Sequence, residues 1–358
     1  MLKIYQKYLI NKLTKTFFFI FFIFFTLVFI MGVIQELNFF SNEDVSFYFP
    51  FFLVFLNLPS ILYEILPFII ILALIILIID LNENGELITF KNNGLNNSKI
   101  LQTLSLASFI LGLLIMLIFY NISAILKFNY LSLKQNYTND SKYLATITEN
   151  GLWIKDEIDE QIIFVNAKRV EKNYLEEVDI LILDKSFNYL STILVDKIDI
   201  LNNTWILESP IIFYEDNSKE ELEEFKIKSN FNYDKIKNLY SELNSLTILG
   251  LLELKNSYKS VNYSTTDIDY QIQKVLITPI YFVILSVISF IVCFNFKQDN
   301  KFILITLGIL ISVMIHYITN FFGLVGKNEK ISITLSVWGP LTILILFSLV
   351  GLIRINEK

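Results

Sequence analysis

The chain has 358 residues, of which 54% are hydrophobic and only 18% are charged, and its mean hydropathy is +0.55. A water-soluble fold of this length could hardly bury so large an apolar share in one core. The composition therefore argues against an ordinary soluble enzyme and indicates an integral membrane protein. The formal net charge is −6, and it is unevenly distributed along the chain.

Six segments run for about 20 residues with almost no charge, which is the length that a helix needs to cross the hydrocarbon core of a bilayer. They cover residues 16–35, 59–79, 100–126, 275–296, 302–326 and 331–353. The first is longer than the apolar part of a signal peptide, and no small-residue cleavage site follows it, so we expect it to remain as a helix. The sequence predicts a bundle of six transmembrane helices, with helices 1–3 in residues 1–127 and helices 4–6 in residues 271–358.

A polar insert, residues 128–270, separates the two groups of helices. It carries 15 Lys and Arg against 25 Asp and Glu, whereas the remainder of the chain carries 14 against 10. Lys and Arg gather in the cytoplasmic loops of membrane proteins. With the N-terminus inside, ten basic residues lie in short cytoplasmic segments and two in short outer loops, which predicts an external insert. The ten are Lys3, Lys7, Lys12, Lys15, Lys91, Lys99, Lys297, Lys301, Arg354 and Lys358.

Inside the insert, short runs rich in Ile, Val, Leu and aromatic residues replace the helical pattern. Asn, Asp, Gly and Ser punctuate these runs, as expected of strands joined by turns. We expect strands within 151–154, 161–165, 178–183, 190–195, 205–207 and 211–214, arranged as an antiparallel sandwich or roll. A more helical stretch is expected after them, at 219–224 and 248–258.

The sequence lacks the residues that several chemistries require. No phosphate-binding G-x-x-x-x-G-K-[ST] loop is present, and His316 and Cys293 are the only His and Cys, so a His-based metal site or catalytic triad would need another chain. We expect no cofactor, no bound metal, no nucleic-acid partner and no enzymatic activity of the chain itself. For His316 we expect a buried, hydrogen-bonded side chain rather than a proton relay with Glu64.

One cytoplasmic loop, residues 80–97, is large enough to contact another subunit. Leu87, Ile88 and Phe90 give it an apolar side, while Glu83 and Glu86 give it a carboxylate side. Gly94 suits the end of a short helix. The pattern fits a short amphipathic helix parallel to the membrane, although an ordinary connector fits the spacing equally well.

At this loop the sequence resembles the lipopolysaccharide-export permeases of the LptF/LptG family. Glu86-Leu87-Ile88 followed by Gly94 is similar to the family's loop, and Leu66-Pro67, Phe321-Phe322-Gly323 and Trp338-Gly339-Pro340 lie in the expected order. The string Gly151-Leu152-Trp153-Ile154-Lys155-Asp156 is similar to the segment that opens the β-domain of the LptG branch and favours that branch. The sequence departs from the family at Gly85, Gln35 and Thr319.

The resemblance implies a six-helix permease subunit with an inserted periplasmic β-jellyroll-like domain, in the inner membrane of a Gram-negative bacterium. It would extract lipopolysaccharide and pass it to a periplasmic bridge for outer-membrane biogenesis. The implied partners are a paralogous LptF-like permease, a cytoplasmic LptB-like ATPase dimer that hydrolyses the ATP, and an LptC/LptA-like bridge protein. A coupling helix at about 80–97 would dock the ATPase through Glu83, Glu86, Leu87, Ile88 and Phe90.

Two other functions remain open at this point. One is a membrane-anchored periplasmic interaction protein, for which six spans are more than an anchor needs. The other is the permease of a different ABC exporter, for lipoproteins or peptides, which four spans would favour.

The expected substrate carries phosphates, yet the spans carry little charge. Lys127, Lys274, Lys327 and Lys330 all fall near the outer ends of predicted helices, with the uncharged Gln35 at the outer end of the first. Each lysine alone is commonly an anchor at the membrane surface. As a set, we expect them to form a basic collar around a lipid headgroup.

Overall fold

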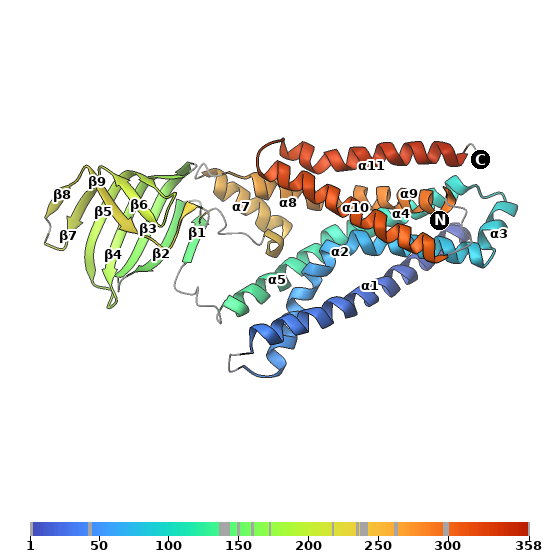
Figure 1. Ribbon diagram of the computed structural model, residues 1–358, viewed down its shortest axis with the longest axis horizontal. Helices are drawn as coiled ribbons and strands as arrows, with labels where there is room; N and C mark the ends of the chain where they lie inside the picture. Colours follow the sequence, from blue (N-terminus) through green and yellow to red (C-terminus); the bar gives the residue numbers. More distant parts are fainter. Residues whose placement is uncertain are drawn as a thin grey trace. The chain divides into compact units, whose positions relative to one another are not determined.

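The computed structural model describes residues 3–41, 45–135, 144–148, 151–158, 161–171, 173–216, 218–233, 236, 243–260, 264–295 and 301–356. The chain forms two compact units. One combines Met1–Tyr130 with Tyr270–Lys358, and the other consists of Leu131–Asp269. The first is a bundle of helices and the second is built around a β-sheet (Figure 1).

Within the described residues, five helical runs are long and apolar enough to cross a membrane. The pair α8 and α9, bent by 54°, makes a sixth when it is counted as one span. This confirms the predicted membrane helix bundle. The spans are α1 (Ile4–Phe39), α2 (Tyr48–Glu83), the run of α4 (Asn97–Leu114), η1 (Ile115–Phe119) and α5 (Tyr120–Gln135), then α8 (Thr266–Leu276) with α9 (Thr278–Asn295), α10 (Lys301–Lys327) and α11 (Ile333–Asn356).

Helix α2 begins about three turns before the predicted start of the second span. We placed that start at Pro59, but Pro59 and Pro67 both lie inside the helix. Proline removes one backbone donor and usually ends a helix in water. Inside a bundle, neighbouring helices and side chains compensate for the lost hydrogen bond, so prolines are tolerated.

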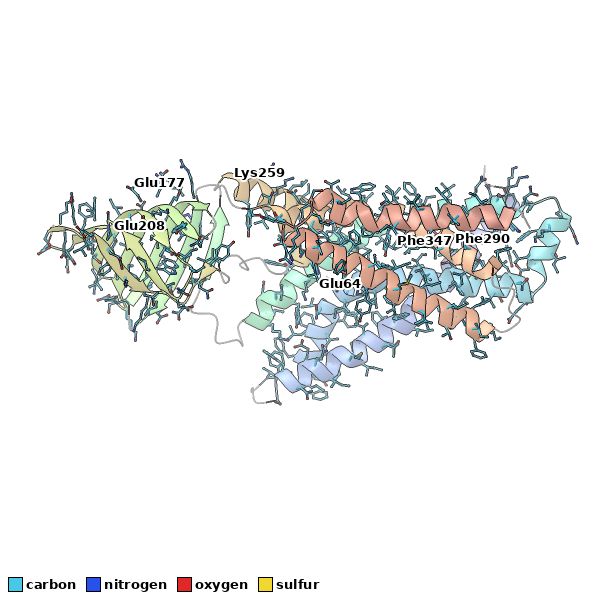
Figure 2. The ribbon with its side chains drawn as sticks, turned by 45° about the horizontal axis from the view of Figure 1, so that its top comes forward. Glu64, Glu177, Glu208, Lys259, Phe290 and Phe347 are labelled. Atoms are coloured by element: carbon cyan, nitrogen blue, oxygen red, sulfur yellow. The ribbon has the colours of Figure 1, made fainter. Side chains whose placement is uncertain are left out.

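The core of the helical unit is centred on α2, which packs against α1, α9 and α10. Its second half, from Ile69 to Leu81, is almost completely buried. Helices α4 and α9 also approach closely, because a Cβ at Gly112 would lie 2.7 Å from the backbone of Pro279. The outer helices instead expose large apolar side chains, such as Phe22 of α1. Phe347 of α11, labelled in Figure 2, is another. This inside-out distribution suits a surface that faces lipid.

The second unit contains a curled sheet in which all pairings are antiparallel, with the order β1-β2-β3-β4-β5-β6-β9 and with β7 between β5 and β8. All six predicted strands are present, so the inserted β-domain is confirmed (Figure 1). The strands are β1 (Leu144–Thr148), β2 (Gly151–Ile158), β3 (Gln161–Glu171), β4 (Tyr174–Asp184), β5 (Tyr189–Asp199), β6 (Thr204–Glu208), β7 (Ile211–Tyr214), β8 (Lys219–Glu221) and β9 (Glu224–Lys228).

Part of the predicted helical stretch is wrong. Residues 219–224 form β8 and the start of β9 rather than a helix. All three residues of β8 are exposed, and β9 alternates exposed and half-buried residues. Charge on every side is typical of an exposed edge as well as of a solvated helix. The second part of the expectation is confirmed, because α7 covers Ile248–Ser260.

The string that opens the β-domain contains a buried carboxylate. Asp156 is only 2% exposed, and it accepts hydrogen bonds from the Ser229 hydroxyl and from the Asn230 backbone and side-chain amides, each at 2.8 Å. A buried carboxylate needs such donors to offset its lost hydration. Asp156 therefore joins β2 to the segment that follows β9.

Candidate functional site

A short helix, α3 (Glu86–Asn92), occupies the loop between α2 and α4. Gly85 precedes it with φ of +68° and Gly94 follows it with φ of +77°. Glycine adopts these angles at low cost, which explains why a glycine stands on each side of the helix. At its end, the Gly94 amide donates to the Lys91 carbonyl at 3.0 Å, and the Leu95 amide to the Phe90 carbonyl at 3.0 Å. The loop thus contains a capped amphipathic helix.

The residues expected on one apolar side of α3 do not all lie together. Leu87 is 6% exposed, and Phe90 packs edge-on against the ring of Tyr8 with 6.3 Å between ring centroids. Ile88 points the other way and is 62% exposed. The cause is the helical period, which places positions three apart on one face and the position next to Leu87 about 100° away.

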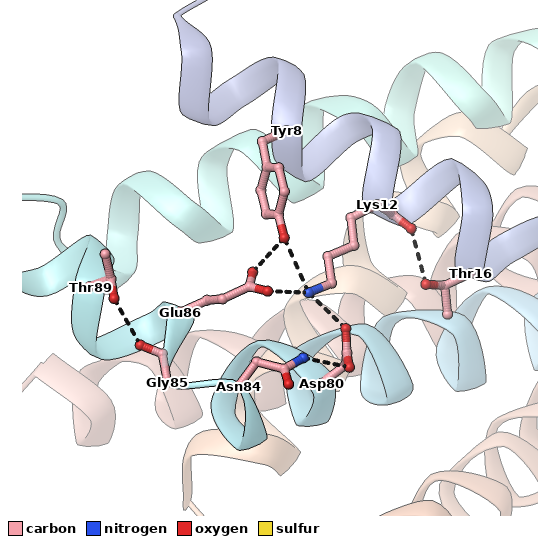
Figure 3. Close-up of polar contacts among 8 residues, drawn as sticks. All are labelled: Tyr8, Lys12, Thr16, Asp80, Asn84, Gly85, Glu86 and Thr89. Atoms are coloured by element: carbon pink, nitrogen blue, oxygen red, sulfur yellow. Dashed lines mark hydrogen bonds and ion pairs between the residues drawn. The ribbon is translucent and has the colours of Figure 1, made fainter.

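Glu86 lies in a polar cluster that joins α1, α2 and α3 (Figure 3). Its carboxylate accepts a hydrogen bond from the Tyr8 hydroxyl at 2.8 Å and forms an ion pair with the Lys12 ammonium at 2.9 Å. The same ammonium lies 2.7 Å from Asp80 at the end of α2. The Lys12 side chain is 16% exposed. Sequence reasoning missed Tyr8, Lys12 and Asp80 as members of this site, and used Lys12 only to assign the orientation.

Glu83 is separate from this cluster. Its side chain is half exposed and lies 3.6 Å from the ammonium of Lys301, which is equally exposed. An ion pair so open to solvent contributes little, on the order of 0 to 1 kcal/mol. Glu83 and Glu86 therefore have different ion-pair partners.

A second candidate site is a cavity of about 280 Å³ inside the helical unit. Residues of α2, α8, α9, α10 and α11 line it, and its wall mixes apolar side chains with polar ones. One of the lining residues is Glu64 of α2, which is labelled in Figure 2. The Tyr63 hydroxyl in the wall lies 3.2 Å from the Thr278 hydroxyl. The polar and charged side chains of the wall include Tyr63, Glu64, Tyr270, Lys274, His316 and Asn320.

One of the four lysines predicted for the collar, Lys274, lines this cavity. A second, Lys327, lies beside it, in contact with the lining residue Tyr270. The Lys327 ammonium lies 5.2 Å from the centroid of the Tyr270 ring. Tyr270 can lie against α10 because Gly323 has no Cβ, which would otherwise collide with the Tyr270 hydroxyl. Tyr270 and Gly323 were not predicted to contribute to this site.

The remaining residues of the predicted collar lie apart from that pair. The Lys127 ammonium donates to the Asn57 side-chain carbonyl at 3.0 Å and lies over the Tyr130 ring. Lys330 is exposed beyond the end of α10, and Gln35 is exposed on α1 next to the buried Glu36. We therefore propose a reduced collar, defined as Lys274 and Lys327.

His316 also lines the cavity. Its ring is half-buried, and Nε2 lies 2.9 Å from the side-chain nitrogen of Asn320. It also lies near the ring of Phe68, with 5.9 Å between centroids. The histidine is hydrogen-bonded as expected, but less buried than expected. Among the described residues, no three His, Cys, Asp or Glu side chains are placed to hold a metal ion together.

The sequence profile of the family described as "Lipopolysaccharide export system permease LptF/LptG" matches residues 7–354. The chain belongs to the LptF/LptG family. The match covers both compact units, α3 and every helix that lines the cavity. No curated protein shows significant sequence similarity to the chain. Membership in the LptF/LptG family makes the chain a permease of a lipopolysaccharide export system rather than an enzyme.

Proposed function

We propose that this LptF/LptG-family chain is one permease subunit of an ABC transporter that extracts lipopolysaccharide from the inner membrane and passes it to a periplasmic bridge. The family match over residues 7–354 carries the proposal. We assign the chain to the LptG branch because of the Gly151–Asp156 string. The chain would pair with an LptF-like subunit and act with an LptB-like ATPase dimer and an LptC/LptA-like bridge.

The location follows from charge and hydropathy. The ten-to-two bias of basic residues supports a multi-pass inner-membrane protein with a cytoplasmic α3 and a periplasmic β-domain. The chain has no phosphate-binding motif of the Walker type. Energy from ATP would therefore reach it through a partner that contacts α3.

Ile88 is the strongest candidate for that contact. It is a large apolar side chain, 62% exposed, on a helix whose other apolar residues, Leu87 and Phe90, are buried or half-buried. An isolated exposed apolar side chain can become the buried centre of an interface when a pocket on the partner receives it. Glu86 keeps about a quarter of its side chain exposed, enough for a cation of the ATPase to reach it.

For the substrate, the reduced collar would contact a phosphate group. The apolar wall of the adjoining cavity, which includes Leu66, Ile71 and Phe282, would contact an acyl chain. A phosphate beside two ammonium groups gains electrostatic attraction, and an acyl chain gains from leaving water. This pairing of charge and apolar surface is what a phosphorylated glycolipid requires.

Co-purification with the ATPase tests the proposal. The tagged chain, expressed with the proposed partner subunits and purified in detergent, should retain the ATPase and lipopolysaccharide. Ile88→Asp should reduce the ATPase recovered by about tenfold or more, because a buried contact is replaced by a charge. Ile4→Asp, at an exposed apolar position of a different helix, α1, serves as the matched control.

Three outcomes would contradict the proposal. Retention of the bridge protein without any ATPase would favour the membrane-anchored interaction protein. Retention of an ATPase together with lipoprotein or peptide, and no lipopolysaccharide, would favour a different ABC exporter. Equal ATPase recovery with Ile88→Asp and wild type would show that docking lies elsewhere.

A further inference from the structure

Helix α3 is connected to α1 as well as to its sequence neighbour α2, and Lys12 makes the connection. We propose that Lys12 is a positioning residue that transmits a displacement of α3 to α1, so that ATPase docking or ATP turnover at α3 moves the first membrane helix. This inference rests on the proposed function, since it needs a partner that acts on α3.

The geometry makes Lys12 the centre of the cluster. One ammonium group on α1 lies 2.7 Å from Asp80 Oδ2 on α2 and 2.9 Å from Glu86 Oε1 on α3. An ammonium has three donors, so it can satisfy both carboxylates at once. Tyr8, one helical turn before Lys12 on the same face of α1, donates a second hydrogen bond to Glu86 at 2.8 Å. Helix α1 therefore holds both oxygens of the Glu86 carboxylate (Figure 3).

The ion pair between Lys12 and Glu86 is partly sheltered from water, whereas the Tyr8 hydroxyl that also binds Glu86 is exposed. The Lys12 side chain is 16% exposed and that of Glu86 is 26% exposed, so water competes less for them than for the half-exposed pair of Glu83 and Lys301. Charge-assisted hydrogen bonds in such surroundings are short and directional. Phe90 adds an apolar contact with Tyr8. Movement of α3 alone would break two charge-assisted bonds and separate two aromatic rings.

Helix α1 packs against α2, but beyond Ile20 the only side chain of α1 that is buried is that of Glu36. Large apolar side chains such as Leu27 and Met31 are exposed there. A helix with so little buried surface can shift more readily than the buried α2. A displacement applied at Lys12 would therefore move α1 rather than the core.

The competing explanation is a purely structural role, in which Lys12 only neutralises two carboxylates that would otherwise repel each other. A structural role predicts that loss of Lys12 lowers stability or assembly. A transmitting role predicts instead that the complex assembles and hydrolyses ATP, but extracts less lipopolysaccharide for each ATP consumed. The ratio of extraction to hydrolysis separates the two.

The experiment uses the full complex reconstituted in proteoliposomes containing lipopolysaccharide. Lys12→Met keeps the length and the apolar stem of the side chain and removes the charge. We expect ATPase recovery and hydrolysis within about twofold of wild type, and lipopolysaccharide released per ATP lower by about tenfold, within the range of measured coupling between sites. Lys12→Arg should restore most of the ratio. Lys15→Met, at an exposed position of α1, should leave it unchanged.

Hydrogen exchange of α1 on addition of ATP provides a second measurement. In wild type, exchange in residues 4–20 should change when ATP is added, and in Lys12→Met this response should be lost. Tyr8→Phe, which removes one hydrogen bond and no charge, should give an intermediate ratio and keeps the test open if Lys12→Met fails to assemble. An unchanged ratio in Lys12→Met and Tyr8→Phe would overturn the inference. A wild-type complex that retains no ATPase would instead overturn the proposed function.

Discussion

Gly323 decides whether Tyr270 can lie beside the reduced collar. A Cβ at position 323 would collide with the Tyr270 hydroxyl and approach Cζ within 2.8 Å. The ring of Tyr270 supports the Lys327 ammonium, so the glycine has an indirect effect on charge placement. The family resemblance included Gly323 only as part of a string, and the structure gives a steric reason for it.

Gly323→Ala should therefore push Tyr270 away from α10. Overpacking of this kind typically costs about 1 to 3 kcal/mol, so we expect a lower unfolding temperature of the detergent-solubilised chain. Yield from a photo-crosslinker at position 327 to lipopolysaccharide should also fall. Gly250→Ala is the control, since its nearest neighbour would lie at an ordinary 3.4 Å. Equal unfolding temperatures for the two variants would contradict the steric argument.

Residue types in the sequence identified Glu86 and its neighbours, but not the partners of Glu86. Lys12 is 74 residues away from Glu86, and Tyr8 is 78 away. Likewise, Tyr63 and Thr278 in the cavity wall are separated by 215 residues. Such contacts depend on which helices pack together, and apolar periodicity does not encode that choice. For the same reason, the four collar lysines were predicted as a set, and only Lys274 lines the cavity, with Lys327 beside the lining residue Tyr270.

Elements with a strong pattern were predictable, and those at an edge were not. The six predicted strands have buried Ile, Val and Leu, whereas β8 is wholly exposed and β9 has no buried residue. Hydrophobic pattern identifies a strand by its buried face, so an edge strand without one is missed. Helix α2 was predicted too short because the span was measured from Pro59, whereas the helix begins at Tyr48.

The edge at β9 is a candidate for docking the bridge protein. β9 pairs with β6, and the other terminal strand of the main sheet order, β1, packs against α7. Strand addition at an exposed edge uses backbone hydrogen bonds. A photo-crosslinker at Lys226 in β9 should therefore capture the bridge protein, and one at Asp179 in the central strand β4 should not. Both positions are exposed. Capture from Asp179 alone would show that a face, not this edge, is used.

At the scale of the whole molecule, composition and hydropathy predicted the fold class. Long uncharged segments produce membrane helices wherever they occur, and alternating apolar residues in an acidic insert produce a sheet. Hydropathy alone did not predict the bend between α8 and α9, because the 275–296 segment carries no charge, although Pro279 at the start of α9 is a residue type that often accompanies a break in a helix. The bend separates the amphipathic α8, with Asp267, Asp269 and Lys274, from the apolar α9.

The orientation of the whole chain is testable by reporter fusions. A reporter active only in the periplasm should be active when fused after Ser186, in the turn between β4 and β5, and silent when fused after Asn93, at the end of α3. The physical reason is that the cytoplasmic side retains Lys and Arg. The reverse pattern would place α3 outside the reach of any cytoplasmic ATPase and would contradict the proposed function.

Helix α1 is 36 residues long, so a small rotation about Lys12 would displace its opposite end by a large distance. Lys12 and Glu36 are 24 residues apart in one helix, or about 36 Å at 1.5 Å per residue. A tilt of about 5° around Lys12 would move the far end by about 3 Å, if the helix stays rigid. There, buried Glu36 accepts a 2.7 Å hydrogen bond from Tyr130 of α5. A displacement that large would break this bond. A small shift of α3 would therefore open a buried polar contact at the opposite end of α1.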